Sequence, residues 1–135
     1  MLRLETAALY AGINILLLLV LAYLVVAGRQ RHKITLGDGG NADFTRAIRA
    51  HANAAEYIPA GLIGIVLLAL FEGSPLWLLH ASGISLTAGR IVHGYGLHTG
   101  TLNLARRVGT AATWLSFALI GGGLIWAGLG QQLGR

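Results

Sequence analysis

A run of polar side chains enters the second long apolar stretch of the chain, and its residue types are those of a binding site. Five of these residues recur at helical spacing: Arg46, Arg49, Asn53, Glu56 and Tyr57. On a helical wheel of about 100° per residue they fall within roughly a third of the circumference, whereas His51 points the other way. An arginine or a carboxylate at membrane depth costs on the order of 3 kcal/mol, so it normally faces a protein interior or a wet cavity. We therefore expect this helix face to line a polar site.

The available side chains favour binding of a charged small molecule over metal or nucleophile chemistry. Arginines pair with carboxylates, while Glu56 can receive an ammonium and Asn53 an amide, so the set suits a small zwitterion with more than one carboxylate. The five histidines show no H-x-x-x-H or H-E-x-x-H spacing, and no metal site is expected. There is no cysteine, so sulfur chemistry must come from a ligand. An additional arginine could hold a ligand thiol as its thiolate.

The composition places these residues in a small integral membrane protein. The 135 residues are 55% hydrophobic and 11% charged, with a mean hydropathy of +0.66. The formal charge of +5 comes largely from basic residues in two loops beside apolar stretches, which is the pattern of topology determinants. We therefore expect membrane lipids as partners and no nucleic acid.

Four apolar stretches predict an all-α, four-helix membrane bundle. The helices are expected at about 6–27, 44–71, 76–98 and 108–130, within a single transmembrane domain over 1–135. The first stretch is too long for a signal peptide and lacks a small-residue cleavage site. Its one polar interruption, Asn14, is expected to hydrogen-bond between helices. The tight connection at 72–75 makes the second and third helices antiparallel neighbours.

The third helix adds Arg90 and His93, which share one face at a spacing of three residues. Counting back from the tight connection places Arg90 at about the depth of Glu56, and His93 level with Asn53. This predicts an ion pair between Arg90 and Glu56, within a subunit or between subunits. A buried pair that only fixes the helix register is the alternative interpretation. We include Arg90 and His93 in the candidate binding site.

The basic residues of the two loops predict an orientation. They are Arg29, Arg31, Lys33, Arg106 and Arg107. The positive-inside rule puts both loops in the cytoplasm, so both termini of this multi-pass protein are expected outside. The polar helix ends converge on the cytoplasmic half, and the site is expected to open there.

Three motifs carry a resemblance that covers nearly the whole chain. They are Arg49-x-x-x-Asn53-x-x-Glu56-Tyr57-x-Pro59, Gly37-Asp-Gly-Gly and Gly89-Arg90-x-x-His93. Together they resemble the membrane-associated proteins in eicosanoid and glutathione metabolism, the MAPEG family, in its bacterial branch. The resemblance implies an inner-membrane homotrimer with glutathione at the subunit interfaces. It also implies conjugation of glutathione to lipophilic electrophiles, or reduction of lipid hydroperoxides.

The resemblance also implies roles for single residues. By motif position, the residues that hold glutathione are Arg49, Asn53, Glu56 and Tyr57. His51 stands where eukaryotic members often have a glutamine, and in a trimer it would face a neighbouring subunit's part of the site. Arg106 would be the catalytic residue that stabilises the thiolate, because Gly109 follows it by three residues and fits that place better than Arg107 does.

One departure from the family pattern keeps a second function open. Where the leukotriene-C synthase type carries two tyrosines late in the third helix, this chain has His93 and Leu97. A non-enzymatic scaffold that binds a lipid or small molecule is therefore the alternative to a glutathione transferase or peroxidase. A small transporter with a charge relay through Glu56, Arg90 and His93 is a third hypothesis. The lack of an evident internal repeat argues against that one.

Overall fold

Each apolar stretch forms a long α-helix in the computed structural model, which describes residues 1–100 and 103–133. The helices are α1 (Leu2–His32), α2 (Ala42–Leu70), α3 (Leu76–Thr99) and α4 (Leu104–Gln132). No strand occurs in the described ranges, so the expected all-α, four-helix class is confirmed. By length and composition, α1, α2 and α4 are apolar enough to cross a membrane.

Local hydrogen bonds explain where the helices begin and end. The Asn41 side chain accepts from the Phe44 N–H at 3.0 Å at the start of α2, and Asn103 accepts from the Arg106 N–H at 3.0 Å at the start of α4. Such caps satisfy backbone donors that the first turn leaves free. Lys33 ends α1 in a left-handed conformation, with φ at 55°. Because these signals lie in the polar flanks, α1 and α4 extend beyond the apolar stretches 6–27 and 108–130.

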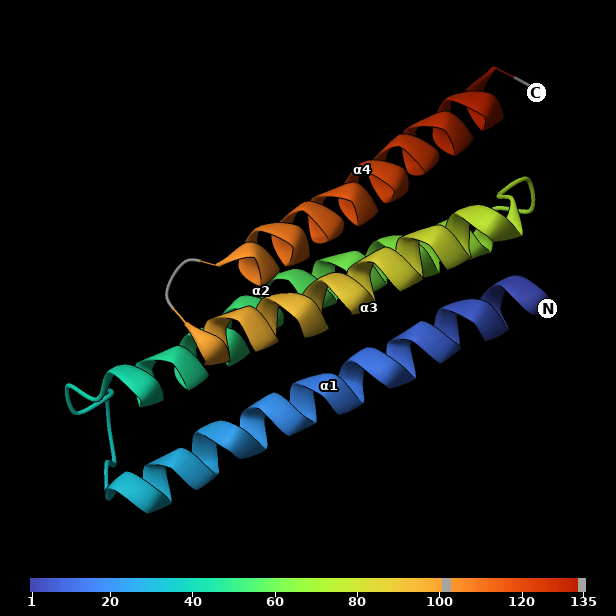
Figure 1. Ribbon diagram of the computed structural model, residues 1–135. Helices are drawn as coiled ribbons and strands as arrows, with labels where there is room; N and C mark the ends of the chain where they lie inside the picture. The colour runs from blue at the N-terminus through green and yellow to red at the C-terminus, as the bar shows by residue number, and fades with distance from the viewer. Residues whose placement is uncertain (101–102, 134–135) are drawn as a thin grey trace.

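The four helices run alongside one another, with α2 and α3 between α1 and α4 (Figure 1). Both outer helices pack against α2 and α3, but within the described residues the backbones of α1 and α4 do not approach each other closely. The beginning of α1 and the end of α4 lie at the same end as the α2–α3 connection (Figure 1). The α1–α2 loop therefore lies at the opposite end, where α4 begins.

Polar contacts join α1 to α3 inside the apolar bundle. The Asn14 side-chain amide is fully buried and donates to the Thr87 hydroxyl at 2.8 Å and to the Tyr10 carbonyl at 2.9 Å. The Tyr10 hydroxyl lies 3.0 Å from Nδ1 of His80. Asn14 thus makes the interhelical bond expected from the sequence.

Two glycines bring α3 and α4 into backbone contact. A Cβ added at Gly89 would lie 2.9 Å from the carbonyl oxygen of Gly109, and one added at Gly109 would lie 2.5 Å from the backbone nitrogen of His93. No side chain fits between the helices at this level. The contact therefore sets Arg90 and His93, which flank it on α3, directly against the start of α4.

Hydrogen bonds hold the α1–α2 loop against the end of the bundle where α4 begins. The Arg29 guanidinium donates to the Gly37 carbonyl at 3.2 Å. The Asp38 carboxylate accepts from the Thr45 hydroxyl at 2.7 Å and the Gly40 N–H at 3.0 Å, and these hydrogen bonds lower the pKa of Asp38. Gly40 has a positive φ of 74°, which favours glycine. The glycine-rich stretch therefore acts as a structured turn.

Candidate functional site

Arg90 is the centre of a buried network that joins three helices. Its side chain is 3% exposed. Nη1 donates to Oδ1 of Asn53 on α2 at 2.5 Å, while Nε donates to Oγ1 of Thr113 on α4 at 2.9 Å. Nη2 donates to the carbonyl of Gly109 at 3.4 Å. The guanidinium carbon also lies 4.9 Å from the centre of the Tyr57 ring, a cation–π arrangement.

The expected ion pair between Arg90 and Glu56 does not form within the chain. Every nitrogen of the Arg90 guanidinium already has an acceptor, and Glu56 is exposed. Asn53 lies one turn closer to the α1–α2 loop, and Glu56 is rotated from it by about 60° around the helix. The long Arg90 side chain extends back over that turn. It therefore contacts the Asn53 amide, one helical turn closer to the α1–α2 loop than the Glu56 partner that counting predicted. Arg90 thereby holds Asn53 and Tyr57 in place.

His93 and Arg106 share a separate pocket of about 300 Å³ at the start of α4. The other lining residues are Arg107, Thr110, Ala111 and Trp114. His93 is 8% exposed, and its imidazole makes no hydrogen bond within the described ranges. Nε of Arg106 is buried and also has no partner there. A buried donor without an acceptor costs about 1–3 kcal/mol, so this pocket is suited to an anionic ligand.

The remaining candidates on α2 lie outside both groups. Arg49 and Glu56 are exposed, and His51 is half-buried. Arg46 forms an ion pair with Asp43, one turn earlier in the same helix. Within the chain, the binding residues inferred from the sequence therefore divide into three sets. These are the Arg90 network, the pocket at His93 and Arg106, and an outward-facing set on α2.

Sequence reasoning missed the part played by α4. Thr113 accepts from Arg90 and donates to the Gly109 carbonyl at 2.9 Å, and it has no exposed surface. The sequence signal for this role of Thr113 was its position one helical turn after Gly109 in an otherwise apolar helix. Small or polar residues one turn apart on a membrane helix indicate a face that packs closely against protein.

The family model that matches this chain is that of the MAPEG family, over residues 7–126. The chain belongs to the MAPEG family. Inner membrane protein YecN of Escherichia coli K12 is 42% identical over 116 residues, which cover 84% of this chain and 86% of the relative. YecN of Escherichia coli O6:H1 matches to the same extent. The apolar helices of this MAPEG protein agree with a place in an inner membrane.

MAPEG membership narrows the range of functions. It places the chain among membrane proteins whose activities include glutathione-dependent transfer and peroxide reduction. The described residues contain no group of three or more side chains that could hold a metal ion. The Arg90 network and the pocket at His93 and Arg106 supply guanidinium, amide, phenol and imidazole side chains.

Proposed function

We propose that this MAPEG protein is a glutathione-dependent membrane transferase or peroxidase acting on lipophilic electrophiles or lipid hydroperoxides. The observation that carries the proposal is the pocket at the start of α4. There Arg106 has a buried nitrogen without an acceptor, and the His93 imidazole makes no hydrogen bond to a described residue. A thiolate is an acceptor of matching charge. The Arg90 network supports the same proposal, because it fixes the Asn53 amide and the Tyr57 ring, two further candidate ligand-binding groups.

The network determines which atoms remain for glutathione. Oδ1 of Asn53 already accepts from Arg90, so its Nδ2 is the group left to donate to a ligand carbonyl or carboxylate. Arg49 would pair with a glutathione carboxylate and Glu56 with its ammonium. Arg106 would favour the thiolate of a thiol whose pKa is ordinarily about 8.5. The electrophile enters from the bilayer, and positioning together with thiolate formation supplies most of the rate enhancement.

The outward-facing residues of α2 support assembly as a homotrimer. Arg49 and Glu56 are exposed in the single subunit, and holding a charge against lipid is costly. The small exposed residues Ala55 and Ala60 share this helix and permit close approach of a second one. We propose that a neighbouring subunit covers this face, that glutathione binds between the two, and that His51 contributes to the neighbour's part of the site. The site would open to the cytoplasm, with both termini outside.

A titration of the detergent-purified protein with glutathione tests the proposal. The thiolate is followed by its ultraviolet difference absorbance, in the wild type and in the Arg106→Ala and Arg107→Ala variants. We expect a saturable thiolate band that Arg106→Ala removes and Arg107→Ala retains. Turnover should fall by about 10²-fold or more in Arg106→Ala, with little change in glutathione affinity. A wild-type protein that gives neither a band nor a heat of binding would contradict glutathione chemistry.

The second candidate is a non-enzymatic scaffold that binds a lipid or small molecule. His93 and Leu97 in place of two tyrosines favour it, because they supply no phenol to a bound thiol. Under this hypothesis the pocket beside Arg106 would take another anion. The same titration separates the two functions, since the scaffold predicts no thiolate band.

A further inference from the structure

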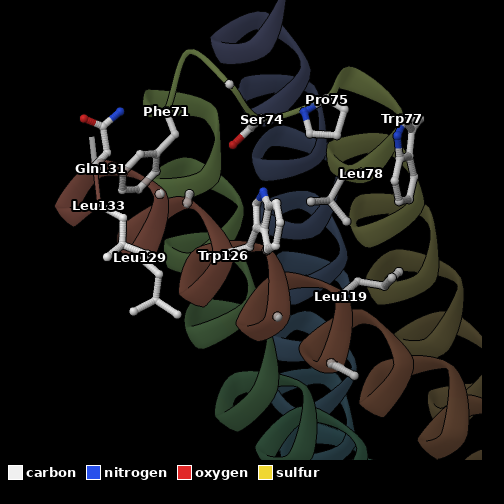
Figure 2. A pocket seen from close by; sticks show the side chains of 16 residues that line it. Phe71, Ser74, Pro75, Trp77, Leu78, Leu119, Trp126, Leu129, Gln131 and Leu133 are labelled. Carbon is white, nitrogen blue, oxygen red and sulfur yellow. The ribbon is translucent and has the colours of Figure 1, made fainter. Parts of the chain in front are cut away.

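An apolar groove of about 670 Å³ lies at the end of the bundle opposite the polar site, between α4 and the α2–α3 connection (Figure 2). Its α4 wall extends from Ala118 to Gln131, about 20 Å at 1.5 Å per residue. That length exceeds the roughly 15 Å of hydrocarbon in one leaflet of a bilayer. The groove is therefore long enough to hold an acyl chain from the headgroup level to the middle of the membrane.

A second hollow, of about 480 Å³, adjoins the groove and carries charge. The two share Gly73, Ser74 and Pro75, and the second is lined by Arg3 and Glu72. No ion pair joins Arg3 to Glu72 in the part of the chain that the structure describes. A guanidinium is suited to a phosphate, and a carboxylate to an ammonium. The hollow thus offers one group for each charge of a zwitterion.

Ser74 lies where the two hollows meet. It is 6% exposed, and its hydroxyl makes no hydrogen bond to any described residue. The next residue, Pro75, precedes α3, and no side chain caps that helix, so its first two backbone N–H groups remain available to an anion, whereas the third donates to the Pro75 carbonyl. Two tryptophans on the walls, Trp77 and Trp126, are 65% and 76% exposed, as is typical of side chains at a membrane interface (Figure 2).

We propose that the two hollows together bind a phospholipid with a phosphoethanolamine headgroup. Arg3, the Ser74 hydroxyl and the start of α3 hold the phosphate, Glu72 receives the ammonium, and one acyl chain occupies the groove along α4. The charges distinguish this lipid from others. Choline carries no N–H to donate to Glu72, and phosphatidylglycerol has no cation at all. The site lies apart from the proposed glutathione site and does not depend on it.

Binding of lipids with identical acyl chains tests the headgroup assignment. Native mass spectrometry of the detergent-purified full chain would measure retention of phosphatidylethanolamine, phosphatidylcholine and phosphatidylglycerol. We expect about tenfold tighter binding of phosphatidylethanolamine than of phosphatidylcholine, from one charge-assisted hydrogen bond. Glu72→Gln should abolish this preference, and Arg3→Gln should weaken binding of all three. Equal binding of the ethanolamine and choline lipids by the wild type would overturn the assignment.

Two adjacent glycines provide a matched test of the groove. A Cβ at either Gly121 or Gly122 meets no atom within 4 Å, so both accept a larger side chain, but only Gly122 lines the groove. Gly122→Leu should therefore reduce retention of phosphatidylethanolamine about tenfold, while Gly121→Leu retains it. Equal retention by the two variants would overturn the proposal. A change of oligomeric state in Gly122→Leu alone would also overturn it, by assigning the groove to a second copy of the chain.

Discussion

Each nitrogen of the Arg90 guanidinium donates a hydrogen bond to a protein acceptor. The guanidinium bonds Asn53, Thr113 and Gly109, from two different helices, and stacks on Tyr57. A residue so fully engaged has no donor to offer a ligand unless the network rearranges. Its contribution to the proposed function is therefore to fix the orientation of the Asn53 amide and the Tyr57 ring.

Removing this network should cost stability. Arg90→Ala leaves buried acceptors on α2 and α4 without donors and opens a cavity, so we expect a loss of about 2–4 kcal/mol in the free energy of unfolding. Arg90→Lys should recover only part of it, because an ammonium cannot reproduce the fork of contacts. Unfolding in mixed detergent micelles measures both. An Arg90→Ala variant as stable as the wild type would show that the network carries no stabilising energy.

The sequence indicated which residues are polar and at what depth, but not which partner each one takes. A helical wheel gives the direction of a side chain on its own helix, whereas the pairing also depends on the rotation of the neighbouring helix and the reach of the side chain. Arg90 was placed level with Glu56 and contacts Asn53 instead. The role of Thr113 was missed for the same reason, because it arises only where α3 and α4 meet.

At the scale of the helices, the backbone contact between Gly89 and Gly109 decides where α4 lies against α3. The spacing of apolar residues predicted both helices but could not predict this closeness, since glycine occurs in membrane helices for several reasons. Other glycines of α4, such as Gly121, face open space. Gly109 and Gly121 therefore have different structural roles, although both are glycines of α4.

This difference predicts opposite effects of the same substitution. Gly109→Ala would set a Cβ 2.5 Å from the backbone of His93, which forces the helices apart, and we expect a loss of about 1–3 kcal/mol. Gly121→Ala adds a side chain in open space and should stabilise the helix by up to about 1 kcal/mol. Thermal unfolding of the two variants in one detergent gives the comparison. A tolerated Gly109→Ala would mean that α4 can shift without loss.

For the whole molecule, the sequence was sufficient to predict an all-α membrane bundle and the MAPEG family, because apolar length and motif spacing are encoded locally. It was not sufficient to locate the apolar groove, whose walls come from α3, α4 and the α2–α3 connection. The two ends of the bundle consequently differ. Arg106 lines an anion-suited pocket at one end, and the groove lies at the other.

The exposed charges of α2 lead to a prediction about assembly. If neighbouring subunits cover Arg49 and Glu56, the detergent-purified protein should have three times the 14.2 kDa mass of one chain by light scattering. Glu56→Arg would set like charges together at that interface and should shift the population toward single chains. Gly121→Leu, a change in open space on α4, serves as a control. A monomeric wild type in mild detergent would contradict the trimer.

The hydrogen bond between Asn14 and Thr87 has a consequence for biosynthesis. The two residues are 73 positions apart, so at 5–20 residues per second a ribosome makes Thr87 about 4–15 s after Asn14. Of the two acceptors that the Asn14 amide has in the folded protein, only the Tyr10 carbonyl of its own helix is present during that interval. The second of these hydrogen bonds of the Asn14 amide therefore forms only after the third helix has been made.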